Sequence, residues 1–350
     1  MRAKSRRVPA FQAEHAQTIL EATEADISKG FAEPMFTWGA FCSNYPAGTF
    51  RTIRRFPVLQ SSGKVRPCDD GDGGGHTDLT CDDNKLSLCN ALQPAVHIRA
   101  LHQAAEELEA DITAWDESVE TGGEDWPDAY RFTPFWPAHR LLAVVMLFHP
   151  KWKDIALVIY NGLLFGLKGA VIAFNRYSLF TERMSRRLLA VLISLYFDDA
   201  TIQDWGSCRG SAQAAVQQVQ TLLGRPFALE KRQDMSLHGD FLGLTHDLTQ
   251  AMQGKVSLTP RQKLVERFTS MARQAKHEDY FPPGLAAKAS GLWNFLQTGV
   301  FGQVGRACLQ PIQSLQYLDL PPFKFTPSLR ATFDMLQAIL ATEFERVVPV

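Results

Sequence analysis

A strongly apolar run at residues 188–195 leads directly into the sequence Tyr196-Phe197-Asp198-Asp199. Such a run predicts a buried β-strand. A buried strand that ends in two carboxylates at a turn places them at the edge of a sheet, beside solvent. Turns also favour aspartate for purely structural reasons, and Asp-Asp recurs at 69–70 and 82–83, so this pair alone does not identify a site.

A third aspartate lies upstream in the sequence Asp125-Trp126-Pro127-Asp128-Ala129-Tyr130. Phosphoryl transfer to a 3′-hydroxyl uses two divalent cations about 3.5–4 Å apart, and hard cations of this kind bind carboxylate oxygens. We therefore expect separate strand ends to bring Asp125, Asp198 and Asp199 together. Two features make the positioning of Asp125 less assured: residues 120–124 are Glu-Thr-Gly-Gly-Glu rather than a run of β-branched residues, and Pro127 lies inside the motif.

The remaining sequence predicts an α+β fold. Apolar residues at helical spacing predict helices at 97–115, 170–187 and 211–223, and the strand with the two aspartates is expected at 188–197. Two apolar runs, 141–148 and 155–160, flank a turn that contains Pro150 and predict a β-hairpin. Beyond residue 244 the chain is expected to be mostly helical, with a last helix at 328–346.

One of these helices is strongly basic. Thr259 is placed as its N-cap and Pro260 at its first position. An apolar stripe through Leu264 and Phe268 is surrounded by five cations: Arg261, Lys263, Arg267, Arg273 and Lys276. The net charge of the chain is −1, so this helix carries a basic surface that the total conceals.

Composition and targeting features narrow the class of protein. With 350 residues and 45% apolar residues, the chain can build one large domain or several subdomains. No apolar run reaches the about 18 residues of a membrane span, and no apolar core follows the basic residues at the N-terminus. The six cysteines are scattered, as in a reduced intracellular protein.

Several blocks, in order along residues 50–310, resemble the motifs of retroelement reverse transcriptases. Asp125 with Ala129-Tyr130 is similar to the first palm motif, and Tyr196-Phe197-Asp198-Asp199 to the Tyr-x-Asp-Asp motif. Residues 64–70 resemble the fingers motif, and residues 163–176 the loop-helix motif behind the templating pair. Lys231 matches a basic position after the second palm helix, and residues 241–244 the primer-grip hairpin. The resemblance is nearest to retrotransposon polymerases of dinoflagellates and related protists.

The resemblance implies a right-hand polymerase with an antiparallel palm sheet backed by helices. It implies an N-terminal segment and fingers at 1–118, a palm at 119–250 and a helical thumb or connection at 251–350. The activity implied is RNA-directed DNA synthesis on a template-primer from deoxynucleoside triphosphates, and no particular oligomeric state is favoured. No nuclease domain is recognisable after the thumb, so the chain is expected to be a fragment of a polyprotein or to rely on another nuclease.

The same resemblance assigns roles to individual residues. Asp125, Asp198 and Asp199 would bind two Mg²⁺ or Mn²⁺ ions, and Lys231 would protonate pyrophosphate. Tyr130 would exclude a 2′-hydroxyl. The other predicted nucleotide contacts are Lys64, Arg66, Gly166 and Lys168, and the predicted nucleic-acid contacts are Tyr196, Phe241, Gly243, Arg261, Lys263 and Arg267.

Other readings stay open at this point. The chain could be a polymerase-like scaffold that binds nucleic acid without catalysis, or an RNA-directed RNA polymerase. It could also be a metal-dependent nuclease or nucleotidyl cyclase, since these enzymes use paired carboxylates on a palm-like sheet. A zinc site would draw on Cys68, His76, Cys81 and Cys89, although their spacing lacks short Cys-x2-Cys pairs. A calcium loop at Asp70-Gly71-Asp72-Gly73 lacks the closing Glu. The aromatic residues Trp293, Phe295 and Phe301 are expected to lie in a helical core.

Overall fold

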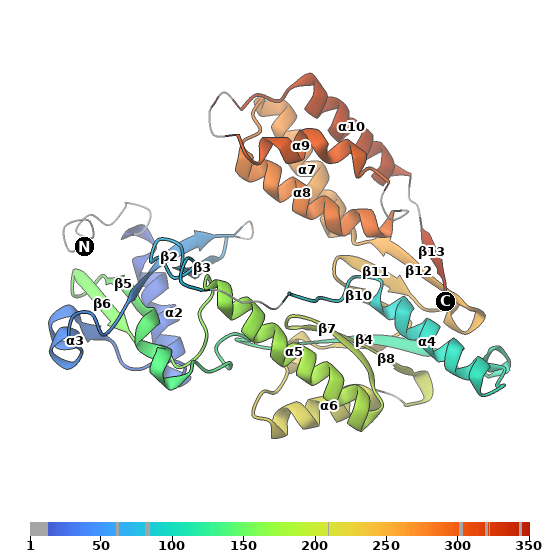
Figure 1. The fold of residues 1–350 in the computed structure, drawn as a ribbon. Helices are drawn as coiled ribbons and strands as arrows, with labels where there is room; N and C mark the ends of the chain where they lie inside the picture. The colour runs from blue at the N-terminus through green and yellow to red at the C-terminus, as the bar shows by residue number, and fades with distance from the viewer. Residues whose placement is uncertain are drawn as a thin grey trace. The chain divides into compact units, whose positions relative to one another are not determined.

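The computed structural model describes residues 13–60, 63–80, 85–208, 210–300, 304–318, 321, 323–342 and 345–350 (Figure 1). The chain divides into two compact units, each made of two stretches: Met1–Ser87 with Pro127–Phe180, and Leu88–Trp126 with Thr181–Val350. Helix α5, Lys168–Leu189, contributes residues to both units. The division at residues 118 and 250 stays a prediction.

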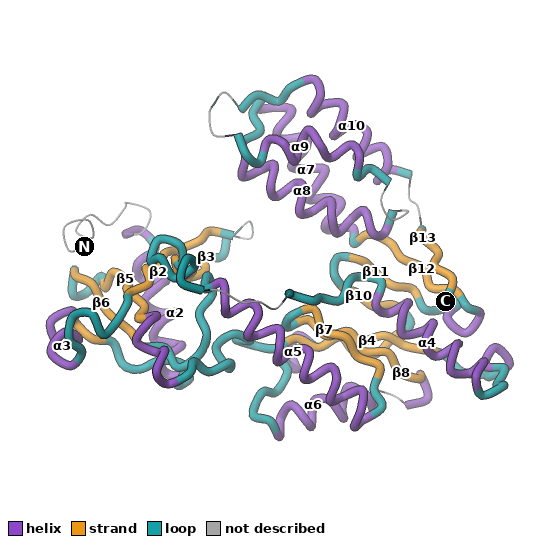
Figure 2. Tube along the Cα trace, in the orientation of Figure 1, coloured by secondary structure: helices purple, strands orange, loops and turns teal. Residues whose placement is uncertain are grey.

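The first unit is built on a five-stranded sheet in the order β1-β6-β5-β2-β3. Strands β2 and β5 are parallel, and the other neighbouring strands are antiparallel. The predicted hairpin is confirmed as β5 and β6, where Val145 lies opposite Val158 in the core. Helix α2 packs on β2, β3 and β5 (Figure 2). The elements of this unit besides α5 are α2 Ala16–Ser28, β1 Phe36–Thr37, α3 Trp38–Asn44, β2 Thr52–Leu59, β3 Val65–Asp70, the 3₁₀ helix Pro137–Ala143, β5 Val144–His149 and β6 Asp154–Val158.

A buried ion-pair network fixes the core of the first unit. Arg55 Nε and Nη2 donate to the two Asp69 carboxylate oxygens at 2.8 and 3.0 Å. Arg131 Nε lies 3.2 Å from Asp26 Oδ2, which also accepts a hydrogen bond from the Tyr160 hydroxyl at 2.8 Å. Both guanidinium groups lie over the Tyr160 ring, 4.7 and 4.6 Å from its centroid. Because removal of one buried charge would leave its partner unpaired, these five side chains hold their elements in one arrangement.

The second unit contains an antiparallel sheet in the order β7-β8-β4-β9 and a second antiparallel sheet in the order β10-β11-β12-β13. Helices α4 and α6 pack on β8 of the first of these sheets (Figure 1). Four further helices, α7 to α10, share a core around Phe268, Trp293 and Phe333. The elements are α4 Gln93–Glu107, β4 Val119–Asp125, β7 Leu192–Tyr196, β8 Asp199–Trp205, α6 Ser211–Leu222, β9 Gln233–Ser236, β10 His238–Phe241, β11 Leu244–Asp247, β12 Lys255–Pro260, α7 Gln262–Glu278, α8 Pro283–Leu296, α9 Gln310–Leu315, α10 Pro327–Ala341 and β13 Arg346–Pro349, with short 3₁₀ helices at Ile112–Ala114, Gly206–Cys208, Leu229–Lys231, Ala251–Gln253, Gln297–Gly299 and Ala307–Leu309.

Strand β4 is the element that the sequence pattern described least well. It forms a strand between β8 and β9, although Thr121 is the only β-branched residue among residues 120–124. Its glycines are explained by close neighbours. A Cβ atom on Gly122 would lie 2.9 Å from the Gln233 carbonyl oxygen, 2.6 Å from the Met235 sulfur and 2.8 Å from Gln213 Nε2. The close backbone oxygen favours glycine at this position, and the chain before Asp125 forms a strand although its residues are poor strand formers.

Two predicted boundaries are wrong: the end of the helix predicted at 97–115, and the junction between the helix predicted at 170–187 and the strand that follows it. In each case the chain leaves the helix at a different residue from the one that the apolar pattern indicates. Helix α4 ends at Glu107, two residues before Glu109 adopts φ +55°, and Ile112–Ala114 forms a separate 3₁₀ turn. Helix α5 continues to Leu189, and Ala190 with φ +55° ends it, so the strand begins at Leu192. The helices predicted at 170–187 and 211–223 are confirmed as α5 and α6.

The C-terminal prediction needs two corrections. Thr259 and Pro260 do not start a helix: they are the last residues of β12, opposite Thr245 and Leu244, and α7 begins at Gln262. Strand pairing thus overrides a local capping signal. The last helix ends at Ala341, and Arg346–Pro349 forms strand β13 rather than a helical end.

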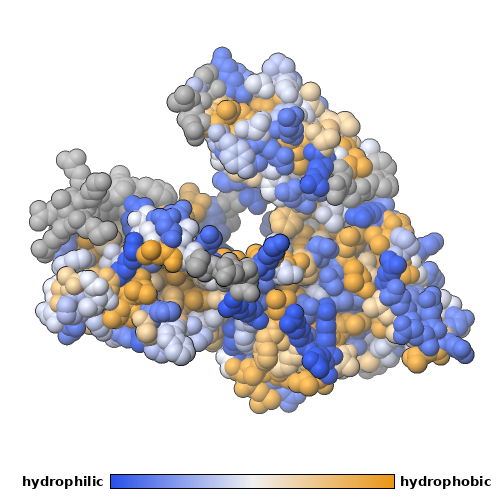
Figure 3. All heavy atoms as spheres, in the orientation of Figure 1, coloured by the Kyte–Doolittle hydropathy of each residue, from blue (hydrophilic) through white to orange (hydrophobic). Residues whose placement is uncertain are grey.

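Helix α4 is amphipathic, with one buried face and one exposed face. His97, Ile98 and Ala105 are buried, whereas Arg99, Gln103, Glu106 and Glu107 are exposed on the other face. Figure 3 shows hydrophilic side chains over the outer end of this helix. None of the helices in the described ranges combines the length and apolar character of a membrane span.

Candidate active site

The three aspartates meet at one end of the β7-β8-β4 sheet. Asp125, the last residue of β4, is the direct cross-strand partner of Asp199, the first residue of β8. Asp199 also pairs with Tyr196 of β7, so Asp198 lies in the two-residue loop of the β7–β8 hairpin. Positions that are far apart in the sequence are therefore brought to one sheet end, as the sequence predicted.

The hairpin loop that carries Asp198 is strained. Phe197, its first residue, has φ +56°, a left-handed conformation that costs a non-glycine residue about 1–3 kcal/mol. Two-residue hairpin loops require such a conformation because it matches the twist of the strands. The Phe197 ring lies edge-on to the Tyr196 ring with centroids 5.3 Å apart. The strand pairing that closes the loop, between Tyr196 and Asp199, imposes this conformation and keeps Asp198 in a tight turn between the two strands.

The carboxyl group of Asp199 favours its neutral form. Its pKa is raised to about 6, first by desolvation, then by the charges of Asp198 and Asp125 and by a side-chain hydrogen bond to Asp125, against the opposing charge of Lys231. Although Asp199 as a whole residue is exposed, the protein around the carboxyl group limits its hydration and so favours the neutral form. An added cation at this position would relieve the repulsion.

Lys231 supplies the nearest positive charge. Its ammonium group forms an ion pair with Asp125 Oδ1, and this hydrogen bond raises the pKa of Lys231 above its ordinary value. The loop before Lys231 is fixed to the same strand, because the Ala228 amide donates to the Asp125 carbonyl at 2.8 Å. The Phe227 ring stacks on Trp126 with centroids 5.0 Å apart. The sequence pattern did not single out Trp126 or Phe227, since their contact joins segments about one hundred residues apart.

Asp125, Asp198 and Asp199 provide the kind of ligand that a divalent cation prefers, but their side chains are not arranged around a common point. Among the described residues, no three His, Cys, Asp or Glu side chains already converge as a metal site. The Lys231 ammonium lies against Asp125, where a cation would need an oxygen ligand. The donor set consists of carboxylate oxygens, which Mg²⁺ and Mn²⁺ prefer, and the raised pKa of Asp199 marks an excess of negative charge.

Tyr130 lies in the first unit, in an aromatic cluster. Its ring stacks on Phe174 at 4.8 Å and packs against Phe165 at 4.5 Å between centroids. The residues before it are also fixed: Lys29 Nζ lies 2.6 Å from Asp128 Oδ2, and Asp128 has φ +50°. These contacts hold the Tyr130 ring in place, and its contact with a nucleotide sugar stays a prediction.

The predicted phosphate-binding cations of the first unit are exposed. Lys64 directly precedes β3, and Arg66 lies on β3 opposite Val58. Because side chains two residues apart on a strand point to the same face, the two cations share one face of the β2–β3 hairpin. Their contact with a nucleotide stays a prediction.

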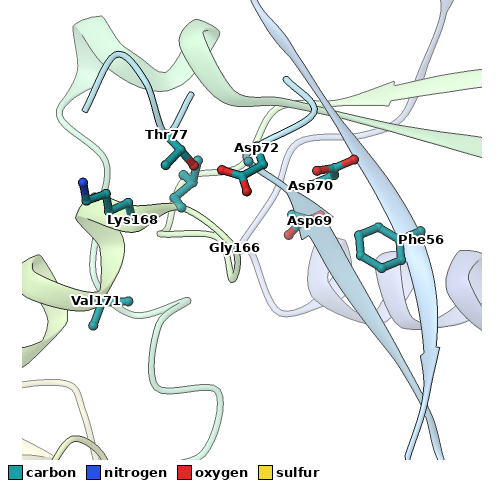
Figure 4. Close-up of a pocket in the computed structure, with 10 residues that line it drawn as sticks. Phe56, Asp69, Asp70, Asp72, Thr77, Gly166, Lys168 and Val171 are labelled. Atoms are coloured by element: carbon teal, nitrogen blue, oxygen red, sulfur yellow. The ribbon is translucent and has the colours of Figure 1, made fainter. Parts of the chain in front are cut away.

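Gly166 and Lys168 line a pocket of about 360 Å³ together with Phe56, Thr77 and Val171 (Figure 4). Three carboxylates also line it, from Asp69, Asp70 and Asp72. Figure 4 shows the Lys168 ammonium on the side away from these carboxylates. The lining does not suit a triphosphate inside the pocket. Gly166 has a packing role as well, since a Cβ atom there would lie 1.9 Å from the Asp69 carbonyl oxygen.

The hairpin predicted at 241–244 is formed by β10 and β11, and the predicted basic helix is α7. Leu242 and Gly243 form the two-residue loop between β10 and β11, both with positive φ, as in a type I′ turn. The Phe241 ring is buried, so a contact with nucleic acid at this residue would use its backbone. Arg261 Nε lies 2.9 Å from Asp240 Oδ2, which ties the start of α7 to the hairpin. Lys263 and Arg267 are exposed on α7.

The described residues give no support to the zinc and calcium alternatives. Cys68, His76 and Cys89 do not form a metal cluster, and Cys81 lies outside the described residues. Asp70 is engaged by Arg54 at 2.8 Å. Of the aromatic stripe, Trp293 lies in the helical core and Phe295 is 40% exposed, while Phe301 lies outside the described residues.

Solved structures with a similar fold include three of foamy viral protease-reverse transcriptase. One, a dRH form, is in complex with double-stranded DNA (TM-score 0.56, 12% identity), one with an RNA/DNA hybrid (0.62, 11%) and one with double-stranded DNA (0.57, 12%). They cover 90%, 96% and 97% of this chain, and this chain spans 46%, 38% and 59% of theirs, respectively. No protein-family model and no curated protein sequence matches the chain. The chain therefore has a reverse transcriptase-like fold.

Proposed function

We propose that this chain is the RNA-directed DNA polymerase part of a retroelement protein and adds deoxynucleotides to a primer. The observation that carries the proposal is the meeting of Asp125, Asp198 and Asp199 at one sheet end, with the pKa of Asp199 raised first by desolvation and then by its two neighbours. This arrangement occurs in a reverse transcriptase-like fold, and the two observations together support nucleotidyl transfer as the reaction.

Asp125 and Asp198 would be the principal metal ligands, with Asp199 as a weaker third carboxylate. When bound, the two cations would activate the primer 3′-hydroxyl and stabilise the leaving pyrophosphate. Lys231 would be released from Asp125 as that carboxylate takes up its ligand role. The freed ammonium group would then stand beside the site with a proton to donate to pyrophosphate.

Nucleotide and nucleic-acid contacts follow from the exposed residues. Lys64 and Arg66 would bind the triphosphate, Arg66 through its planar fork of donors and Lys64 as a point charge. Tyr130, held by Phe165 and Phe174, would exclude the 2′-hydroxyl of a ribonucleotide. Lys263 and Arg267 would bind the backbone of the template-primer duplex, because exposed cations along a helix suit phosphates.

Primer extension tests the proposal. The purified chain should extend a DNA primer on an RNA template with Mg²⁺ and deoxynucleotides, and Asp198→Asn should abolish extension. Asp334→Asn removes an exposed carboxylate from α10 and serves as the matched control. Absence of extension by the wild-type chain, or equal extension by Asp198→Asn, would overturn the proposal.

A second candidate is a polymerase-like scaffold that binds nucleic acid without catalysis. The observation that favours it is the ion pair between Lys231 and Asp125, together with the absence of a ready-made metal cluster among the described residues. Binding of a template-primer in the absence of any incorporation, with either Mg²⁺ or Mn²⁺, would select this candidate. Extension by the wild-type chain would exclude it.

A further inference from the structure

A buried polar network lies on the same sheet as the carboxylates, away from the end that carries them. It consists of Thr121 on β4, Ser194 on β7, and Thr201 and Gln203 on β8, with His97 from α4 and Arg186 from α5. The four strand residues are at most 2% exposed. Polar side chains are uncommon at such positions, where a sheet usually packs apolar residues against its helices. The proposed chemistry does not use any of the six.

Gln203 is the centre of this network. Its Nε2 atom donates to Thr121 Oγ1 at 2.8 Å and to Thr201 Oγ1 at 2.9 Å, and its Oε1 atom contacts His97 Nδ1. A single side chain thus joins β8 to β4 and to helix α4. Both polar ends of the amide are satisfied inside the protein, so the network is complete at its centre.

The neighbours of His97 define its tautomer. Arg186 Nη2, which can only donate, lies 3.2 Å from His97 Nε2, so this nitrogen accepts and Nδ1 carries the proton given to Gln203. Arg186 Nη2 also donates to Ser194 Oγ at 2.7 Å, and the Ser194 hydroxyl lies 3.1 Å from His97 Nε2. Burial and the charge of Arg186 lower the pKa of His97 to about 4, which agrees with a neutral ring. The neutral His97 ring therefore donates to Gln203 through Nδ1 and accepts through Nε2.

The network and the carboxylates are two ends of one ladder. Thr121 pairs with Gln203, Gly123 with Thr201, and Asp125 with Asp199, and these three pairs lie on the same face because side chains alternate along a strand. Four residues, or about 13 Å, separate the Thr121–Gln203 pair from the Asp125–Asp199 pair. Any shift of β4 against β8 at one end is transmitted directly to the other.

Strand β4 is poorly specified by its own side chains. Gly122 and Gly123 have no side chain to pack, and the pairing of β4 with β9 shifts register between Thr121 and Gly123. Glycine-rich strands are prone to slip, and a one-residue slip would turn Asp125 to the opposite face. A directional hydrogen bond such as that between Gln203 and Thr121 selects one register in a way that apolar contacts cannot.

We propose that Gln203 is a positioning residue that sets the register of Asp125 against Asp199 through its hydrogen bond to Thr121, with His97 holding the glutamine amide in place. The effect on catalysis rests on the proposed polymerase function, whereas the effect on strand register does not.

The test compares Gln203→Leu and Thr121→Val with Thr332→Val, which removes a buried hydroxyl from α10, away from both sheets. In primer extension, the Mg²⁺ concentration for half-maximal rate should rise about tenfold in Gln203→Leu, as for residues that orient metal ligands. It should rise in Thr121→Val and stay unchanged in Thr332→Val. Since one bond connects the two positions, the double variant should resemble Gln203→Leu alone.

A second readout does not depend on activity. Hydrogen exchange of the amides at 119–125 should accelerate in Gln203→Leu and Thr121→Val and not in Thr332→Val. Unchanged exchange in this strand, or an unchanged Mg²⁺ requirement in an active Gln203→Leu protein, would overturn the inference. If the wild-type chain extends no primer, the proposed function fails while hydrogen exchange still decides the claim about register. If Gln203→Leu does not fold, Thr121→Val decides it.

Discussion

The ammonium group of Lys231 forms an ion pair with Asp125, the residue directly opposite Asp199 in the β4–β8 ladder. Its positive charge lies on the carboxylate that ends β4, close enough to Asp198 and Asp199 to interact with both. The position of Lys231 depends on the loop before it, which is held against β4 by the stacking of Phe227 on Trp126. Lys231 can therefore be tested separately for two proposed roles: as a positive charge beside the carboxylates and as a proton donor.

Replacement of Lys231 by Ala should lower the maximal rate of extension by about 10²–10⁴-fold, the usual contribution of a general acid. Lys231→Arg keeps the charge but cannot release a proton at working pH, so it should bind nucleotide normally and remain slow. Lys288→Ala, an exposed lysine on α8, is the control. Full activity of Lys231→Arg in single-turnover kinetics would show that only the charge is needed.

The raised pKa of Asp199 predicts how stability changes with pH. A carboxyl group whose folded-state pKa of about 6 lies above its unfolded value of 3.8 stabilises the fold at low pH, and this contribution is lost as pH rises through 6. Asp199→Asn should therefore melt at a higher temperature than the wild-type chain at pH 7.5, and the difference should shrink towards pH 4. Thermal melting across this pH range, without divalent cations, measures the effect.

Glu124 also titrates in this range, because burial raises its pKa to about 7 despite Arg232 at 2.7 Å. The difference between wild type and Asp199→Asn cancels this contribution, which both proteins share. A melting difference that does not change between pH 4 and 7.5 would contradict the assignment to Asp199.

Replacement of Tyr130 by Ala should admit ribonucleotides. The preference for deoxynucleotides should fall by about 10- to 200-fold, the range over which an apolar pocket discriminates one small group. Tyr130→Phe keeps the ring that stacks on Phe174 and should keep the preference. The ratio of kcat/KM for the two kinds of nucleotide gives the result, and an unchanged ratio in Tyr130→Ala would remove this residue from sugar selection.

The candidate site at Asp198 and Asp199 could be predicted from the sequence because these residues lie at a strand end marked by a change from apolar to charged residues. The strand before Asp125 could not, since the close neighbours of Gly122, among them the Gln233 carbonyl oxygen, lie far along the chain. Thr259 and Pro260 carry a local helix signal that pairing with β11 overrides.

The network around Gln203 was equally hidden from the sequence. Its central contact joins residues that are 106 positions apart, and no local pattern marks a glutamine that will pair with a histidine on a distant helix. Local patterns therefore located the carboxylates, whereas the contacts that support them depend on the tertiary fold. Lys231 lies between these cases, because the resemblance gave its position and only the structure gave its partner.

The exposed cations of α7 give the last prediction. Lys263→Ala and Arg267→Ala should each weaken binding to a template-primer duplex by a similar factor for all sequences, because a phosphate contact carries no base information. Each should also reduce the slope of log affinity against log salt by about 1, as one fewer counterion is released. Arg261→Ala should act differently, since Arg261 also binds Asp240 of the β10–β11 hairpin and its loss disturbs that hairpin. Fluorescence anisotropy at several salt concentrations separates these cases, with Lys288→Ala on α8 as the control. Equal salt slopes for wild type, Lys263→Ala and Arg267→Ala would place the duplex on another surface of the chain.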